Sequence, residues 1–269
     1  MSNTPNDLVR NHVQVKLARN ELVTSMIVRL VRSIEIVRIA KTAGFDTIYV
    51  DLEHNPFSLE TTGQICLAAL ATGVTPFVRI PAVEPRFISR VLDCGALGII
   101  APHINSAAEA AEIVRWAKYT PRGQRSVVGA LPHLGYRSLP WAEAQQTMDG
   151  LTSVIAMVET GAAVEHADEI AGVDGVDMLL IGAGDLSNDL GVPGQPDHAT
   201  MDDAHRRVIE ACLRRGKHVG LGGLANRPEL LSRYIALGAR YVSTGSDLDL
   251  LLKAASDRAA LVAAMAPRS

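Results

Sequence analysis

Cysteine is scarce in this sequence. Its 269 residues include three cysteines, Cys66, Cys94 and Cys212. An odd number without metal-ligand spacing argues against both a disulfide framework and a cysteine-bound metal site. Because free cysteines are usually buried, we expect three reduced core thiols in a cytoplasmic protein.

Strong charge and long apolar runs are also missing. The formal net charge is −3, and no Lys/Arg-rich run occurs, so nothing favours nucleic acid or an anionic membrane as a partner. No stretch of about 18 uncharged apolar residues is present, and the opening MSNTPNDLVRNHVQ lacks a signal-peptide core. No P-loop occurs, and no predicted strand is followed by G-x-G-x-x-G, so there is no nucleotide fingerprint.

The chain does contain a regular series of short apolar runs. With 48% hydrophobic residues it can bury a substantial core. Continuous apolar runs are typical of parallel strands buried on both faces. Eight such runs are Ser25–Val28, Thr47–Leu52, Pro76–Ile80, Leu97–Ala101, Ser153–Val158, Asp177–Ile181, His218–Leu221 and Arg240–Ser243.

Helical segments separate these runs. Residues 107–118 and a stretch from Thr200 or Asp202 to Arg215 have helical periodicity, and glycine precedes several strands, as at Gly44, Gly95 and Gly238. An open doubly wound sheet uses the same units, but eight strands in this length favour a (β/α)8 TIM barrel.

No linker or change of composition divides the chain, so we predict one domain over residues 1–269. Residues 1–20 would be an N-terminal extension, and 248–265 a C-terminal helix. Residues 119–150 are longer than an ordinary loop before a strand, which indicates a role in a pocket or a subunit contact.

In such barrels the chemistry lies where strands end, and polar residues gather there in this sequence. Glu159 and Asp185 follow the fifth and sixth runs. Two carboxylates without a neighbouring His or Cys suit a hard cation such as Mg²⁺ or Mn²⁺. Each one alone would equally suit a helix N-terminus.

Further polar residues occur at the ends of the second, third and fourth runs. In Asp51-Leu52-Glu53-His54 an acid beside an imidazole can make histidine a general base, although a structural hydrogen bond is the alternative. Arg79, inside an apolar strand, needs a structural acid or a bound oxyanion as its partner. His103 follows the fourth run.

Glycines after two other runs can bring backbone N–H groups close to an anion such as a substrate carboxylate. They are Gly182 and Gly184 after the sixth run and Gly222 after the seventh. Tight turns alone would also account for them.

Together these residues resemble the HpcH/HpaI aldolase family of metal-dependent pyruvate aldolases, over nearly the whole chain. The matching segments are AGFDTIYVDLEHNPFSLE, PFVRIP, LDCGALGIIAPHINSAAEA, YTPRGQRS, VETGAAVEHADEIAGVDGVDMLLIGAGDLSNDLG and GGLAN. Their order and spacing make the signal specific.

The resemblance implies a role for each site residue. Glu159 and Asp185 would bind a divalent metal (Mg²⁺, Mn²⁺ or Co²⁺), and Arg79 would stabilise the enolate oxygen. His54 would work with Asp51 in proton transfer, with either His54 or a metal-bound hydroxide as the base.

Other groups would support this centre. Glu53 would lie near the metal waters, and the backbone at Gly184 and Asp185 would hold the pyruvate carboxylate. Glu84 would reach a neighbouring active site. The resemblance also implies a homo-oligomer, a hexamer built from dimers that exchange the C-terminal helix.

The implied activity is cleavage or formation of 4-hydroxy-2-oxo acids from a pyruvate or hydroxypyruvate enolate and an aldehyde. Three positions depart from the usual family pattern: Met157 replaces Gln, Ala183 replaces Pro, and Ser126 replaces Gly. Substrate choice is therefore less transferable than reaction type. The alternatives are a citrate-lyase-β or malyl-CoA type lyase and a non-catalytic metabolite-binding barrel.

Overall fold

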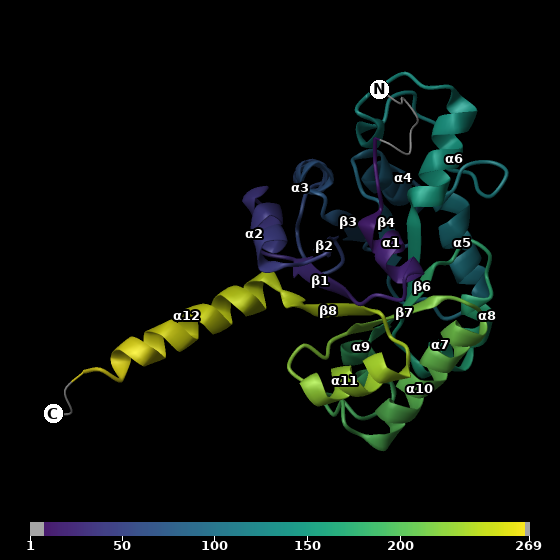
Figure 1. Cartoon of the computed structure of the whole chain (residues 1–269). Coiled ribbons are helices and arrows are strands. Elements are labelled where there is room, and N and C mark those ends of the chain that lie inside the picture. The colour runs from purple at the N-terminus through teal and green to yellow at the C-terminus, as the bar shows by residue number, and fades with distance from the viewer. Residues whose placement is uncertain (1–7, 267–269) are drawn as a thin grey trace.

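The strands of the chain form a closed parallel barrel in sequential order (Figure 1). The computed structural model describes residues 8–266. Each of the eight predicted runs forms a strand, which confirms the predicted (β/α)8 barrel. The strands are β1 Val23–Val28, β2 Thr47–Asp51, β3 Thr75–Arg79, β4 Gly98–Ala101, β5 Ser153–Val158, β6 Met178–Gly182, β7 His218–Gly222 and β8 Tyr241–Ser246.

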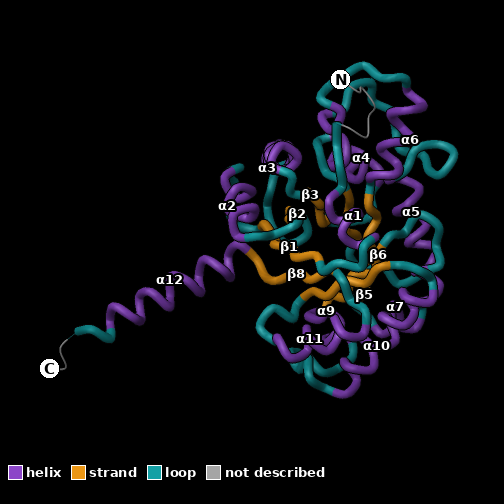
Figure 2. The backbone as a smooth tube through the Cα atoms, in the orientation of Figure 1, coloured by secondary structure: helices purple, strands orange, loops and turns teal. Residues whose placement is uncertain are grey.

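Helices alternate with the strands and surround the barrel (Figure 2). The predicted glycines at helix C-termini are present. Gly44 ends one helix with φ 90°, and Gly238 ends another with φ 124°. The helices are α1 His12–Ala18, α2 Glu35–Ala43, α3 Leu59–Thr72, α4 Pro85–Asp93, α5 Ala107–Ala117, η2 Pro132–Leu134, α6 Trp141–Leu151, α7 Gly161–Glu165, α8 Ala167–Ala171, α9 Ala183–Asp189, α10 Ala199–Arg214, α11 Pro228–Leu237 and α12 Asp247–Ala263.

Alternate residues of each strand belong to two different hydrophobic cores, one beneath the helices and one inside the barrel. Ile48 and Val50 of β2 join the cluster beneath the helices, whereas Tyr49 joins the cluster that fills the barrel. Phe77 of β3, Met157 of β5 and Leu180 of β6 also face inward. Because side chains on one face of a strand recur every second residue, the next inward positions are Asp51, Arg79, Glu159 and Gly182. Parity therefore places four predicted site residues at the mouth of the barrel.

The opposite end of the barrel, its base, is closed by α1. Val13 and Leu17 of this helix pack into the inner cluster, and Asn11 Nδ2 donates to Leu151 O at 2.8 Å and to Ser153 Oγ at 3.1 Å. The predicted N-terminal extension thus contributes a plug from residue 8 onward, while residues 1–7 lie outside the described part.

The long segment before β5 also lies at the base. It contains η2 and α6 and packs a small cluster that includes Tyr119, Leu131, Leu134 and Met148. Its buried Arg125 donates to Asp93 Oδ1 at 2.7 Å and lies over the Tyr119 ring. The pocket that this segment helps to build is therefore at the base, away from the mouth.

Helix α12 extends away from the barrel, as Figure 1 shows at its yellow end. Its side chains Leu251, Leu252 and Val262 are exposed. Its first residue, Asp247, is buried and accepts hydrogen bonds from the backbone N–H groups of Arg29, Leu30 and Val31. The start of α12 therefore fixes the loop after β1. Within residues 8–266, no helix has the length and apolar character required to cross a membrane.

Candidate active site

Asp51 and Arg79 form the buried centre of the mouth. They are register partners on β2 and β3, and Arg79 Nε donates to Asp51 Oδ1 at 2.9 Å. Asp51 also accepts from Asn55 Nδ2 at 2.6 Å and from the Glu53 N–H at 3.1 Å. The sequence left two possible partners for Arg79, a structural acid or a bound oxyanion. The structure contains the structural acid, which is Asp51.

Glu53 is the carboxylate on which Arg79 and two histidines converge. Its Oε2 lies 3.0 Å from Arg79 Nη1 and 3.6 Å from His54 Nε2, and its Oε1 lies 3.0 Å from His103 Nε2. The buried Oε2 accepts no hydrogen bond from the described residues. A buried carboxylate oxygen without a donor is unusual, so this position suits a further donor such as water or a substrate hydroxyl.

His103 links Glu53 to Glu159. Its backbone adopts φ 56°, which directs its N–H to Glu159 Oε2 at 2.8 Å, and its Nδ1 lies 3.4 Å from the same oxygen. A left-handed backbone is uncommon for residues other than glycine and occurs where surrounding structure imposes it. The sequence marked His103 as a strand-end residue but gave it no role. Its place directly after the fourth apolar run was the signal that the sequence offered.

Glu159 and Asp185 follow the ends of β5 and β6, and the charge of Asp185 acts on Glu159. Glu159 is 2% exposed and fits against Gly182, where an added Cβ would lie 2.7 Å from Glu159 Oε1. Asp185 is exposed in the first turn of α9. Gly182 is therefore required by the close approach of the Glu159 carboxylate, which is a more specific reason than a tight turn.

The pKa directions separate these carboxylates. Burial raises the pKa of Glu159; contacts with His103 oppose this shift, while the charges of Glu53 and Asp185 reinforce it. Burial alone would also raise the pKa of Asp51, but its hydrogen bond and ion pair with Arg79 outweigh burial and lower it. Asp51 is thus a fixed anion, and Glu159 is a carboxylate short of positive charge.

The His54 ring lies beside Glu53 rather than Asp51. Its side chain is 54% exposed, whereas the side chain of Asp51 is bonded to Arg79 and Asn55. The carboxylate nearest this imidazole is therefore Glu53, two residues along the chain from Asp51, the partner that the resemblance implied. The reason is local: Asp51 faces into the barrel, and Glu53 and His54 belong to the loop beyond it.

The predicted glycines lie on adjoining strand ends. Gly182 and Gly222 are register partners on β6 and β7. Gly184 is exposed, and a Cβ there would meet nothing within 4 Å, so its backbone is open to a ligand. Gly223, with φ 79°, packs close enough that a Cβ would lie 3.3 Å from the Gly184 nitrogen.

Two other predicted positions lie around this centre. Met157 is 4% exposed and belongs to the inner cluster, one inward position below Glu159. Glu84 is the exposed residue that precedes α4, on the loop after β3. Neither contacts the ion-pair network directly.

All five lysines of the sequence lie away from the mouth. Lys118 has the burial and lowered pKa that characterise Schiff-base lysines, with desolvation as the main cause. Its Nζ, however, donates to the backbone carbonyls of Asp149 and Thr152 at the base, just before β5. The site therefore offers carboxylates, imidazoles and a guanidinium, but no amine nucleophile.

Among residues 8–266, no cluster of three or more His, Cys, Asp or Glu side chains is arranged to hold a metal ion. The candidate pair, Glu159 and Asp185, would supply two oxygen ligands. Mg²⁺ is commonly bound by one or two carboxylates, with water and substrate oxygens completing the shell. The pair therefore fits a cation that is shared with a substrate.

The chain matches known proteins along most of its length. Residues 26–254 match the model of the HpcH/HpaI aldolase/citrate lyase family. It is 40% identical over 253 residues to 4-hydroxy-4-methyl-2-oxoglutarate aldolase of Hapsidospora irregularis, which covers 93% of this chain and 94% of that protein. It is 39% identical over 256 residues to the protein of that name in Chaetomium globosum, with 94% and 95% covered.

A solved structure is similar over almost the whole fold. The HpcH/HpaI aldolase of Desulfitobacterium hafniense superposes with a TM-score of 0.90 at 31% sequence identity, covering 96% of this chain and 98% of that one.

Proposed function

Because this chain belongs to the HpcH/HpaI aldolase/citrate lyase family, we propose that it forms and cleaves 4-hydroxy-2-oxo acids through the enolate of pyruvate or hydroxypyruvate. Membership confirms the resemblance read from the sequence and the prediction of an aldolase that acts on carbon–carbon bonds. The non-catalytic barrel is thereby set aside.

The observation that carries the proposal is the carboxylate pair at the mouth. Glu159 is buried, its pKa is raised, and the charges of Glu53 and Asp185 add to that shift. A divalent cation between Glu159 and Asp185 would relieve this repulsion, and the space left by Gly182 keeps one Glu159 oxygen close to the β6 end. A bound cation would supply Lewis acidity at the carbonyl of a chelating 2-oxo acid.

Arg79 is the residue of this chain suited to the developing enolate oxygen. A neutral-pH base is too weak for such a carbon acid by on the order of ten pK units, or about 14 kcal/mol. Asp51 holds Arg79 Nε, and Glu53 lies against Nη1. The guanidinium therefore keeps a fixed direction and its charge, and such preorganised charge needs no reorientation during the reaction.

The imidazoles of His54 and His103 are placed to move a proton. Both side chains are more than half exposed, and both have Nε2 near Glu53. A histidine here can accept the hydroxyl proton of a 4-hydroxy-2-oxo acid during cleavage. His54 Nε2 lies 3.6 Å from Glu53, farther than His103 Nε2 at 3.0 Å. We therefore assign proton transfer to His54, and we assign His103 to orienting Glu53 and Glu159.

The most direct test of the function is exchange of the pyruvate methyl protons in D2O, followed by ¹H NMR. With added Mg²⁺, Mn²⁺ or Co²⁺ we expect exchange without any acceptor, and EDTA should stop it. A screen of aldehydes and 2-oxo acids against pyruvate and hydroxypyruvate then defines the acceptor. Proton exchange at the rate of a protein-free solution with every metal would contradict the proposal.

The same screen includes malyl-CoA and citramalyl-CoA type thioesters. Cleavage confined to the thioesters would replace the proposed substrate class with that of the CoA-dependent lyases. Trapping with borohydride and pyruvate should leave no adduct, because no lysine lies at the mouth.

Replacing His54 with alanine should lower kcat for aldol cleavage by about 10²-fold, since a general base contributes at least that much. Mn²⁺ affinity, measured by electron paramagnetic resonance, should be unchanged. His198→Ala, which removes an exposed imidazole before α10, is the matched control. A His54→Ala enzyme with normal kcat would remove His54 from the mechanism.

We also propose a homo-oligomer, a hexamer in which α12 is exchanged between subunits and Glu84 reaches a neighbouring mouth. The exposed apolar side chains of α12 support this arrangement. Light scattering of the full chain and of a variant with Leu251→Glu and Leu252→Glu tests it. If α12 packs on another subunit, the assembly formed by the substituted chain should have a lower mass than that of the unsubstituted chain.

A further inference from the structure

A cleft of about 560 Å³ lies at the base between α1, the end of α3 and η2. It lies at the end of the barrel opposite the mouth, because Gly73 and Val74 in its wall directly precede β3. A volume of this size is typical of sites for small molecules. The proposed aldolase chemistry gives this cleft no role.

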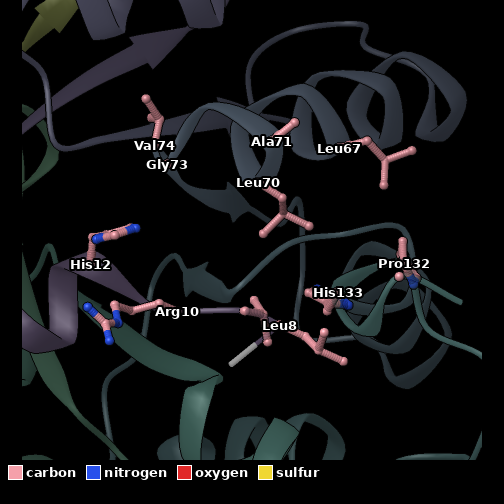
Figure 3. Close-up of a pocket in the computed structure, with 12 residues that line it drawn as sticks. Leu8, Arg10, His12, Leu67, Leu70, Ala71, Gly73, Val74, Pro132 and His133 are labelled. Atoms are coloured by element: carbon pink, nitrogen blue, oxygen red, sulfur yellow. The ribbon is translucent and has the colours of Figure 1, made fainter. Parts of the chain in front are cut away.

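One end of the cleft is cationic. Figure 3 shows Arg10 and His12 on one side of the opening. Lys41 joins them, since its Nζ and His12 Nε2 lie 3.8 and 3.6 Å from the position that a Cβ on Gly73 would take. Asp46 is the nearby acid, but it already binds Lys16 Nζ at 2.8 Å and the Thr24 N–H at 2.9 Å.

No ion pair involves Arg10 or Lys41 within the described chain, and none of the residues that line the cleft is acidic. Burial and the charges of Lys41 and Arg10 lower the pKa of His12, which leaves Arg10 and Lys41 as the cations at this end of the cleft. Cations that converge without an acidic partner attract an anion, and low-dielectric walls strengthen that attraction.

The middle of the cleft is apolar. Leu8 and Leu70 lie between the cationic end and the Pro132–His133 end in Figure 3, with Leu67 and Ala71 farther along α3. His133 is 3% exposed; its Nε2 is 3.0 Å from Ala96 O, and its Nδ1 has no hydrogen-bond partner. Because Nδ1 is shielded from solvent as well, His133 closes the far end of the cleft and is not a contact for a ligand.

We propose that this basal cleft binds a small amphipathic anion, whose carboxylate contacts Arg10, His12 and Lys41 and whose apolar body covers Leu8 and Leu70. The ligand class follows from the order of the lining along the cleft, which is cationic at one end and apolar beyond it. Neither a nucleotide nor a simple inorganic anion matches the apolar middle.

The probe for a test is octanoate, titrated into the full chain by isothermal calorimetry with saturating pyruvate present. We expect saturable binding that pyruvate does not displace, and weaker binding of octan-1-ol and octylammonium. Arg10→Gln combined with Lys41→Gln should raise the octanoate Kd at least tenfold, whereas Arg207→Gln, an exposed arginine on α10, should leave it unchanged.

A second variant keeps the test independent of charge. Ala71 is exposed on α3, so Ala71→Phe should fold while it fills the cleft and should also weaken octanoate binding at least tenfold. Equal octanoate affinity in the charge variant and in the unsubstituted chain would overturn the proposal, as would displacement by pyruvate. A change in assembly mass in Ala71→Phe with unchanged octanoate affinity would instead assign the cleft to a subunit contact. Aldolase activity is not a readout, so this outcome is separate from that of the proposed function.

Discussion

Glu159→Gln is expected to lower kcat/KM for cleavage of a 4-hydroxy-2-oxo acid on the order of 10³-fold. Glutamine keeps the shape that fits against Gly182, and its amide oxygen can still accept the His103 N–H. It removes the negative charge on which a shared divalent cation would depend. A loss of electrostatic stabilisation at a site of this kind is among the largest effects that one substitution produces.

The measurement pairs retro-aldol kinetics with Mn²⁺ binding by electron paramagnetic resonance. Both activity and Mn²⁺ affinity should fall in Glu159→Gln, and EDTA treatment of the unsubstituted chain should reproduce the loss of activity. Glu169→Gln, an exposed carboxylate on α8, is the matched control. If Glu159→Gln kept a tenth or more of the activity, Glu159 would not be a ligand.

Arg79→Lys should lower kcat by about 10²- to 10³-fold with a smaller change in KM. Lysine keeps the charge but presents one compact ammonium, which cannot contact Asp51 and Glu53 as the guanidinium does and also face a substrate oxygen. Charge aimed at the enolate oxygen acts mainly in the transition state, so its loss is read in kcat.

Methyl-proton exchange of pyruvate should fall with kcat in this variant, because both depend on forming the enolate. Circular dichroism and thermal unfolding separate this effect from misfolding, and Arg207→Lys on α10 is the control. A variant with slow cleavage but normal proton exchange would place Arg79 in a later step than enolate formation.

The sequence predicted the barrel well because its signal is local. Each strand is a short apolar run, buried on both faces, and helix-ending glycines punctuate the runs. The same periodicity that buries Tyr49 and Phe77 inside the barrel brings Asp51 and Arg79 to the mouth. The residues at the strand ends could therefore be predicted from the sequence.

The detailed contacts of the site could not be predicted from the sequence. The positions of Glu53 and His54 depend on how the loop after β2 leaves the barrel, and this loop has no periodicity to read. His103 acquires its contacts through a left-handed backbone that its residue type does not favour. The basal cleft combines α1, α3 and η2, which lie far apart in the chain, so no local pattern indicates it.

Asp247 connects α12 to the mouth of the barrel through hydrogen bonds. One carboxylate holds three successive amides of the loop after β1, and the helix that it begins has 17 residues, a rigid arm about 25 Å long. The orientation of α12 and the position of the loop after β1, at the mouth end of the barrel, are therefore linked through a single carboxylate.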